Sequence, residues 1–392
     1  MNNKNETIYI IDALRTPIGK LYGALSHIRP DDLAALVVKK MIQRKQLDVN
    51  NIDGIILGCA NQAGEDNRNI ARMASFLAQL PYSTTAITIN SLCSSGMEAI
   101  FAGLRQIALG EGHLYIAGGV ESMSRSPMVT SRVDETTVDS TIGWRFVNPE
   151  MAPTCPPLSM PETAELLAQA HQINREQQDS YAFHSRQKYQ KALEKEVWKD
   201  EITPITDSKN QVWKSDEQHR LLSLELLSKL PKLVASGQYI SSGNAARIGD
   251  GAALVALASE QYVREHNIKP LAKVHAWSSA SCHPNEMSLA AVAATKKLLN
   301  KTELKPKDLD WIEMSEAFAV QALACIEALE LDPALVNPNG GALTMGNPIS
   351  VGAARLVVSL AHEINRNNAI QRGLATTSAG LGTGSALILE QA

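Results

Sequence analysis

The chain has 392 residues, of which 44% are hydrophobic and 20% are charged, and its formal net charge is −4. This length allows two or three domains with a substantial core. The small net charge, without blocks of one sign, argues against nucleic acid or a membrane surface as a partner. No apolar run approaches the length of a membrane span, and residues 1–6 lack the apolar core of a secretory signal. Five scattered cysteines without CxxC spacing favour a reducing compartment, the cytoplasm, and the nine histidines show no metal-ligand pairing.

Short apolar strands and helices alternate over the first 121 residues. The helix predicted over 31–44 starts with Asp31 and Asp32 and has Lys40 and Arg44 near its end, as the helix dipole favours. Because strands and helices alternate, we expect a largely parallel sheet with helices on both faces. The strands predicted here are 7–11, 52–58, 86–90 and 114–117, and the further helices are 69–80 and 97–109.

The composition of the chain and the pattern of its elements change between about residues 122 and 243. Five prolines fall between 149 and 161, followed by a charged helical stretch over 175–197 and by polar connectors. This pattern predicts an insertion with its own helices, of the kind that often carries binding loops.

From residue 244 the alternation of strands and helices resumes. We therefore predict a duplicated α/β fold with parallel-rich mixed sheets. Its N-terminal half covers 1–121 and 244–268, an inserted loop domain covers 122–243, and the C-terminal half covers 269–392. The elements predicted after 243 are strands 251–257, 311–314, 374–377 and 386–389 and helices 261–267, 287–300, 316–329 and 351–366, with a glycine-rich turn at 339–341.

Cys93 is the leading candidate for a reactive residue. It lies between the β-branched run 86–89 and an apolar helical segment that Ser94, Ser95 and Gly96 open. Free backbone N–H groups and the positive end of the helix dipole are then expected beside its sulfur. This setting favours the thiolate, which is the nucleophilic form. The alternative is a small buried hydrophobic residue, as many single cysteines are.

Several motifs in one order resemble the thiolase family over nearly the whole chain. Further pieces, at 58–69, 141–146 and 160–164, resemble its 3-oxoadipyl-CoA thiolase branch. The resemblance implies two joined α/β halves, each with a five-stranded core sheet, and a loop domain that holds coenzyme A. It also implies a homodimer or homotetramer and an acyl-accepting Cys93. The family motifs are Asp12 to Lys20, Asn90 to Ile100, Gly118 to Ser124, Gly243-Asn244-Ala245, Asp250 to Ala253, Glu316 to Ala319 and Asn337 to Ala342.

The same resemblance assigns site residues and shows departures at three catalytic positions. The backbone N–H groups of Cys93 and Gly380 are expected to hold the oxyanion of acyl transfer. Asn347 replaces the histidine that helps activate the nucleophile, Ser378 replaces the cysteine that shuttles the α-proton, and Ser315 replaces an asparagine of a second oxyanion hole.

Coenzyme A is expected as a substrate in the form of its thioester, with no resident cofactor and no metal. The residues expected to contact it are Met160, Arg220 and Ala246, although the family usually has serine at position 246. Arg220 is open to a second interpretation as a solvated charge.

The departures affect carbon–carbon bond chemistry more than acyl transfer. Loss of one oxyanion donor costs on the order of 10²–10³ in rate. A serine hydroxyl does not titrate near neutral pH, so Ser378 cannot replace a thiol in general acid–base catalysis, which is worth about 10²–10⁴. If the protein were a decarboxylative synthase, it would need another catalytic base. His283, in a loop of the C-terminal half, is the candidate for that base.

Three hypotheses remain open. The first is a thiolase-like acyltransferase that forms an acyl-thioester on Cys93 and passes the acyl group to an acceptor. The second is a non-catalytic homologue that binds acyl-CoA or completes an oligomer, including one with other chains of a biosynthetic complex. The third is an atypical 3-oxoacyl-CoA thiolase, similar to the 3-oxoadipyl-CoA enzymes.

Overall fold

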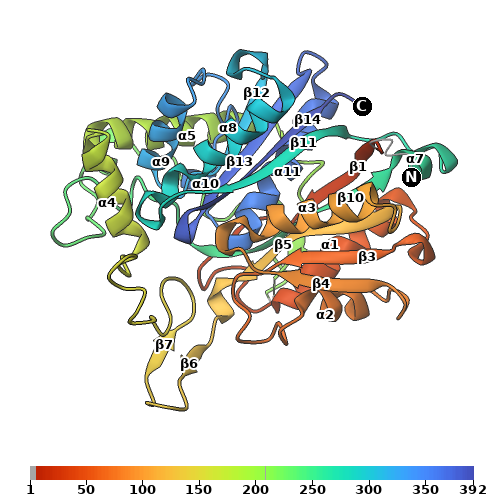
Figure 1. Ribbon diagram of the computed structural model, residues 1–392, viewed down its shortest axis with the longest axis horizontal. Helices are drawn as coiled ribbons and strands as arrows, with labels where there is room; N and C mark the ends of the chain where they lie inside the picture. Colours follow the sequence, from red (N-terminus) through yellow and green to blue (C-terminus); the bar gives the residue numbers. More distant parts are fainter. Residues whose placement is uncertain (1–5, 208) are drawn as a thin grey trace.

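The computed structural model describes residues 6–207 and 209–392. The prediction that residues 1–6 lack the apolar core of a secretory signal falls largely on residues 1–5, which lie outside the described residues. A ten-stranded mixed sheet runs through the described part of the molecule, with helices on both faces (Figure 1). Its strands are β1 (Ile8–Arg15), β2 (Gly19–Lys20), β3 (Gly54–Gly58), β4 (Thr85–Ile89), β5 (Leu114–Ser122), β10 (Gly249–Ser259), β11 (Ala272–Ser281), β12 (Trp311–Met314), β13 (Arg372–Ala379) and β14 (Thr383–Glu390).

The sheet consists of two similar halves that meet where β1 pairs with β11. The strand order is β12-β13-β14-β11-β1-β10-β5-β3-β4, and β2 pairs with β10. In the first half β10 lies antiparallel between β1 and β5, and in the second half β14 lies antiparallel between β11 and β13. This common pattern confirms the predicted duplicated α/β fold.

Two details of the predicted sheet are wrong. Parallel pairing is confined to β5-β3-β4 and β12-β13, because β10 and β14 return in the opposite direction and separate strands that otherwise run the same way. The second half has four strands in the described residues, where the resemblance implied five. A single bridge between Ile312 and Val336 lies beside its edge strand.

The helices divide into an inner pair and an outer set. α3 and α11 pack against each other and against one face of the sheet, and their apolar side chains share a core with β1, β5 and β10. α1 and α2 cover the other face of the first half, and α8 and α9 cover the second half. The helices are α1 (Pro30–Lys45), α2 (Ile70–Leu77), α3 (Ser95–Ala108), α7 (Glu260–Glu265), α8 (Ala290–Thr302), α9 (Ala319–Ala328), α10 (Ala342–Met345) and α11 (Ile349–Arg366).

Two of these helices begin later than predicted. The segment at 287–289 belongs to a short 3₁₀ helix, η4 (Pro284–Leu289), and α8 starts at Ala290. α9 starts at Ala319 because Glu316 is used elsewhere: its buried carboxylate accepts hydrogen bonds from Tyr181, Ser185 and Asn337.

The segment between β5 and β10 carries the predicted insertion. Its two long helices each start with a capping box, formed by Ser159 and Glu162 in α4 (Met160–Ala170) and by Asn174 and Gln177 in α5 (Arg175–Glu194). α5 packs against α9 and α10 of the second half, and α4 packs against α9 (Figure 1). The exact limits of the three predicted units stay a prediction. The other elements of this segment are the hairpins β6 (Met128–Thr130)–β7 (Thr137–Asp139) and β8 (Ile205–Thr206)–β9 (Val212–Trp213) and helix α6 (Leu224–Ser228).

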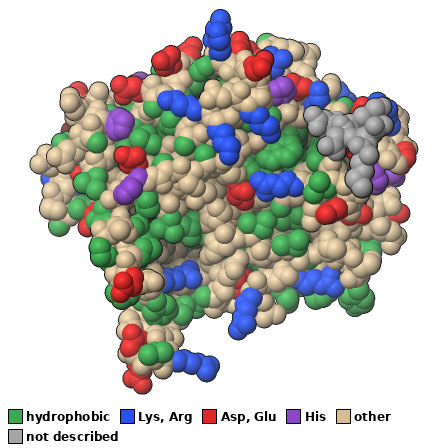
Figure 2. Space-filling view, in the orientation of Figure 1, with side chains coloured by type: hydrophobic (Ala, Val, Ile, Leu, Met, Phe, Trp, Pro, Cys, Tyr) green, Lys and Arg blue, Asp and Glu red, His purple; other side chains and the backbone are tan. Residues whose placement is uncertain are grey.

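The β6–β7 hairpin stands away from the rest of the surface, as Figure 2 shows at the lower left. Its apolar side chains Met128 and Val133 are exposed. Across the described residues, none of the helices combines the length and the apolar character that crossing a membrane requires.

Candidate active site

Cys93 lies at the turn that the sequence predicted. It is the middle residue of a short 3₁₀ helix, η2 (Leu92–Ser94), between β4 and α3. Leu92 has a φ of +50°, an uncommon backbone conformation for a residue with a branched side chain. Two side chains hold this turn: Asn90 Oδ1 accepts from the Leu92 N–H at 3.0 Å, and Ser95 Oγ donates to the Leu92 carbonyl at 2.6 Å. Local hydrogen bonds therefore fix the direction of the Cys93 side chain.

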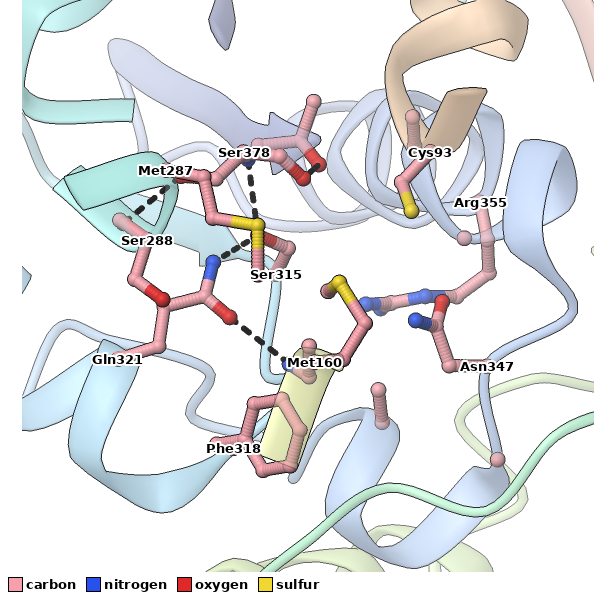
Figure 3. A pocket seen from close by; sticks show the side chains of 16 residues that line it. Cys93, Met160, Met287, Ser288, Ser315, Phe318, Gln321, Asn347, Arg355 and Ser378 are labelled. Atoms are coloured by element: carbon pink, nitrogen blue, oxygen red, sulfur yellow. Dashed lines mark hydrogen bonds between the residues drawn. The ribbon is translucent and has the colours of Figure 1, made fainter. Parts of the chain in front are cut away.

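Three of the other predicted residues reach Cys93 from the second half of the chain. Ser315 follows β12, Asn347 lies between α10 and α11, and Ser378 is on β13. Together with Cys93 they line a cavity of about 20 Å³ (Figure 3). This volume is enough for about one water molecule. Residues more than 220 positions apart in the sequence thus share one small site.

Burial changes the expected chemistry of Cys93. Desolvation raises the pKa of its thiol to about 11, and the backbone N–H of Gly380 opposes that rise. The buried carboxylate of Glu121 also raises the pKa of Cys93 by repulsion. In the protein without substrate, desolvation therefore opposes the stabilisation of the thiolate that is expected from the helix terminus. The Gly380 N–H is close enough to the sulfur to lower its pKa, and its role in holding the oxyanion stays a prediction.

Ser378 has a structural set of hydrogen bonds. Its Oγ accepts from the Ala291 N–H at 2.9 Å and donates to the Ser288 carbonyl at 2.8 Å. Ala291 is in the first turn of α8, whose N-cap residue, Leu289, supplies no side-chain cap. Ser378 therefore serves as a cap for α8 from a neighbouring strand, and its only proton is already donated.

Ser315 is arranged differently, because its Oγ accepts two hydrogen bonds. They come from Gln321 Nε2 at 3.1 Å and from the Ser378 N–H at 3.3 Å. Gln321 is fixed in turn, since its Oε1 accepts from the Ala317 N–H at 3.1 Å. A hydroxyl that accepts two bonds keeps its own proton for donation.

Asn347 and Arg355 place two further donors at the same cavity. The Asn347 backbone N–H donates to the Arg247 carbonyl at 2.7 Å, and its side-chain amide has no hydrogen-bond partner among the described residues. Arg355, on α11, forms a buried ion pair with Glu313 at 2.9 Å. Figure 3 shows Cys93, Asn347 and Arg355 directed into one space. Sequence reasoning did not select Arg355, although a basic residue inside the apolar stretch 349–361 is a usable signal.

The residues predicted to contact coenzyme A do not all come together. Met160, at the start of α4, lines the cavity beside Cys93. Arg220 is exposed and lines a separate small pocket with Arg186 and Arg247. Ala246 donates its backbone N–H to the Ala317 carbonyl at 2.9 Å and lines neither of these cavities.

The remaining candidates are structural or distant. His283 is exposed, its Nδ1 accepts from the Asn285 N–H at 3.2 Å, and it does not line the Cys93 cavity. It therefore cannot act as the base of a synthase from this position. Cys59 and Cys325 are buried in the core.

The comparisons with known proteins agree with this fold and site. The family model "Thiolase, N-terminal domain" matches residues 8–261, and "Thiolase, C-terminal domain" matches residues 268–391. The chain is 44% identical over 397 residues to the 3-oxoadipyl-CoA/3-oxo-5,6-dehydrosuberyl-CoA thiolase of Escherichia coli K12, with 98% of this chain and 99% of that protein covered. It is 41% identical, over the same shares, to the beta-ketoadipyl-CoA thiolase of Acinetobacter baylyi.

Solved structures give the same result. Human mitochondrial 3-ketoacyl-CoA thiolase in complex with CoA superposes with a TM-score of 0.92 at 32% identity, covering 99% of this chain and 98% of that one. The acetyl-CoA acetyltransferase of Bacillus anthracis superposes with a TM-score of 0.93 at 35% identity, covering 99% and 100%. Fold and site thus define an acyltransferase of the thiolase superfamily, and the chain belongs to the thiolase family. The predicted resemblance is confirmed.

Proposed function

We propose that the protein takes an acyl group from a coenzyme A thioester onto Cys93 and passes it to an acceptor without removing an α-proton. The hydrogen bonds of Ser378 carry this proposal. Its hydroxyl is held between the Ala291 N–H and the Ser288 carbonyl, so it does not face the cavity as a free acid or base. Condensation and thiolysis at a 3-oxoacyl chain both need such a group, whereas acyl transfer does not.

Acyl transfer uses groups that this chain retains. Cys93 Sγ attacks the thioester carbonyl carbon, and the carbonyl oxygen becomes an oxyanion between the N–H groups of Cys93 and Gly380. The oxyanion collapses, the bond from the acyl carbon to the sulfur of coenzyme A breaks, and that sulfur takes the proton that Cys93 loses. The free amide of Asn347 is a further donor for the acyl group or the acceptor.

The mass of the intact protein tests this proposal. Incubation with an acyl-CoA should add the mass of one acyl group to the wild type and none to Cys93→Ala. The acceptor can be a thiol, an amine or a hydroxyl, and added nucleophiles should restore the original mass at different rates. A folded wild type that gains no mass from any donor would support a non-catalytic, acyl-CoA-binding homologue.

A second candidate is an atypical 3-oxoacyl-CoA thiolase. It is favoured by the 41–44% identity to proteins named as 3-oxoadipyl-CoA or beta-ketoadipyl-CoA thiolases. Here Ser315 Oγ–H and the Asn347 amide would have to hold the enolate oxygen. Thiolysis of 3-oxoadipyl-CoA by purified protein, expressed in a host without its own thiolases, would establish this activity and remove the first proposal.

We also propose a homodimer or homotetramer located in the cytoplasm, with coenzyme A thioester as substrate and with no resident cofactor. The many similar thiolases support the substrate class, and the cysteine usage supports the compartment. Light scattering after size exclusion measures the oligomeric state, and co-purification from the native host would reveal any further chain.

A further inference from the structure

Another small pocket adjoins the turn that carries Asn347, and three arginines line it. They are Arg186, Arg220 and Arg247, and we call the site the arginine pocket. Gly346 lines both this pocket and the cavity beside the nucleophile, so the two sites are neighbours across that turn. The volume of the arginine pocket is about 10 Å³. This is close to the least space that holds a water molecule, so the pocket as it stands suits a single small particle.

Arg186, on α5, brings a positive charge into the interior, since only 4% of the residue is exposed. Its Nη1 donates to the Ala182 carbonyl at 2.8 Å and its Nη2 to the Gly243 carbonyl at 3.0 Å. Both partners are neutral, and its other N–H groups have no acceptor in residues 6–207 and 209–392. Desolvation and the nearby charge of Arg247 lower the pKa of Arg186 to about 10. A buried cation is costly without a counter-charge, so an anion in the pocket would remove much of this cost.

No acid of the described chain neutralises the three arginines by contact. The carboxylates that attract Arg186 are those of Glu316 and Asp179, and both are engaged elsewhere. Glu316 accepts hydrogen bonds from three other side chains, and Asp179 forms an ion pair with Arg175 at 2.6 Å. Arg220 and Arg247 are exposed, and their guanidinium groups have no hydrogen bond or ion pair with any residue that the structure describes. The wall of the pocket therefore carries an excess of positive charge.

A buried hydroxyl adds a neutral donor to this wall. Thr344, on α10, is 4% exposed, and its Oγ1 has no hydrogen-bond partner in the described ranges of the chain. Gln218 is fixed, because its Nε2 donates to the Ile248 carbonyl at 3.1 Å, and its unpartnered Oε1 is an acceptor. That oxygen suits a guanidinium N–H and contributes nothing to an anion. The unused donors of Thr344 and the three arginines thus face a single unused acceptor.

We propose that the arginine pocket binds one small monovalent anion, chloride, between Arg186, Arg247 and the Thr344 hydroxyl. A monatomic anion has no preferred direction, so it accepts hydrogen bonds from donors on different elements. A phosphate group is larger than the pocket, which separates this site from the expected contact of Arg220 with coenzyme A. The ion holds Arg247, whose carbonyl accepts from the Asn347 N–H at 2.7 Å, and it therefore steadies the turn at the active site.

Thermal unfolding in chloride and in gluconate, an anion too large for the pocket, tests this assignment at equal sodium concentration. Wild type should show a saturable rise in Tm of about 2 °C when chloride is present at about ten times its Kd. Arg247→Met and Thr344→Val should lose most of that rise. Arg132→Met, at an exposed arginine between β6 and β7, is the control and should keep it. Chloride should also slow hydrogen exchange in peptides that cover residues 342–348, in wild type and in the control alone.

Crystals soaked in bromide locate the ion, since bromine gives an anomalous signal that is expected between Arg186 and Thr344. Equal Tm values in chloride and gluconate would overturn the assignment, as would a chloride effect that Arg247→Met and Thr344→Val both retain. A bromide peak without any effect of these substitutions on Tm would mean an adventitious ion only. A rise in Tm with inorganic phosphate and none with chloride would replace the proposed site by a phosphate site. None of these measurements involves Cys93, so their outcome is independent of the acyl transfer proposed above.

Discussion

The raised pKa of the half-buried Cys93 thiol leads to a prediction about pH. With a pKa of about 11, roughly one thiol in 10⁴ is ionised at pH 7. A free cysteine with a pKa of about 8.5 has a thiolate fraction that is higher by about 300-fold. Because the thiolate is the nucleophile, the reaction of Cys93 with a small alkylating agent should be slow at neutral pH. Its rate should rise about tenfold for each unit of pH from 7 to 10.

Alkylation by iodoacetamide, followed by peptide mass analysis, measures this reaction separately for each cysteine. The peptide analysis separates Cys93 from the other four cysteines, and burial also raises the pKa of three of them, Cys59, Cys282 and Cys325. Cys93→Ser provides the control that identifies the peptide. A rate that levels off with a midpoint below about pH 8.5 would refute the reasoning. It would show that the Gly380 N–H and the helix terminus outweigh desolvation even in the absence of substrate.

Further predictions concern the replaced residues and one buried acid. The triple variant Asn347→His/Ser378→Cys/Ser315→Asn should catalyse acetoacetyl-CoA thiolysis at least about 10²-fold faster than wild type. The reason is that it restores an oxyanion donor and a thiol that titrates near neutral pH. A wild type that is already active, with no gain in the variant, would contradict the proposed function. Ser378→Ala should lower the free energy of unfolding by about 1–2 kcal/mol in urea titrations, since the Ala291 N–H loses its acceptor. Burial raises the pKa of Glu363 to about 7, so its stabilising contribution is complete below the unfolded pKa of about 4.3 and is lost as the pH rises through 7. Glu363→Gln should therefore be more stable than wild type by about 1–3 kcal/mol at pH 8 and by less at pH 5, as urea unfolding at the two pH values would show; an equal difference at both would contradict it.

Local patterns predicted the elements around Cys93 because their causes are local. The β-branched run 85–89 forms β4, and the apolar spacing after Gly96 forms α3. The pKa of Cys93 could not be predicted in this way, because it depends on desolvation of the sulfur by its surroundings. The residues that line the same cavity, among them Met160 and Met287, are far away in the sequence. The site residues of the second half were found only through the motifs of the family.

Sheet neighbours were harder to predict than strands. The alternation of strands and helices gives the direction of β1, β3, β4 and β5, but it cannot show that β10 enters between β1 and β5. The surroundings of Arg145 were hidden for a similar reason. In the sequence it lies between Trp144 and Phe146, and only the fold places it on the wall of a second, larger cavity that Cys93 also lines.

The position of β10 has a consequence for synthesis of the chain on the ribosome. β10 pairs with β1 and β5 along nearly its whole length, yet 137 residues separate Ser122, the end of β5, from Ser259, the end of β10. At about 5–20 residues per second, translation of that stretch takes roughly 7–27 s. Throughout that interval the facing edges of β1 and β5 lack their central partner, and unpaired strand edges are sites of intermolecular association. Nascent chains halted between 122 and 249 should therefore bind chaperones, and release should follow once β10 has emerged.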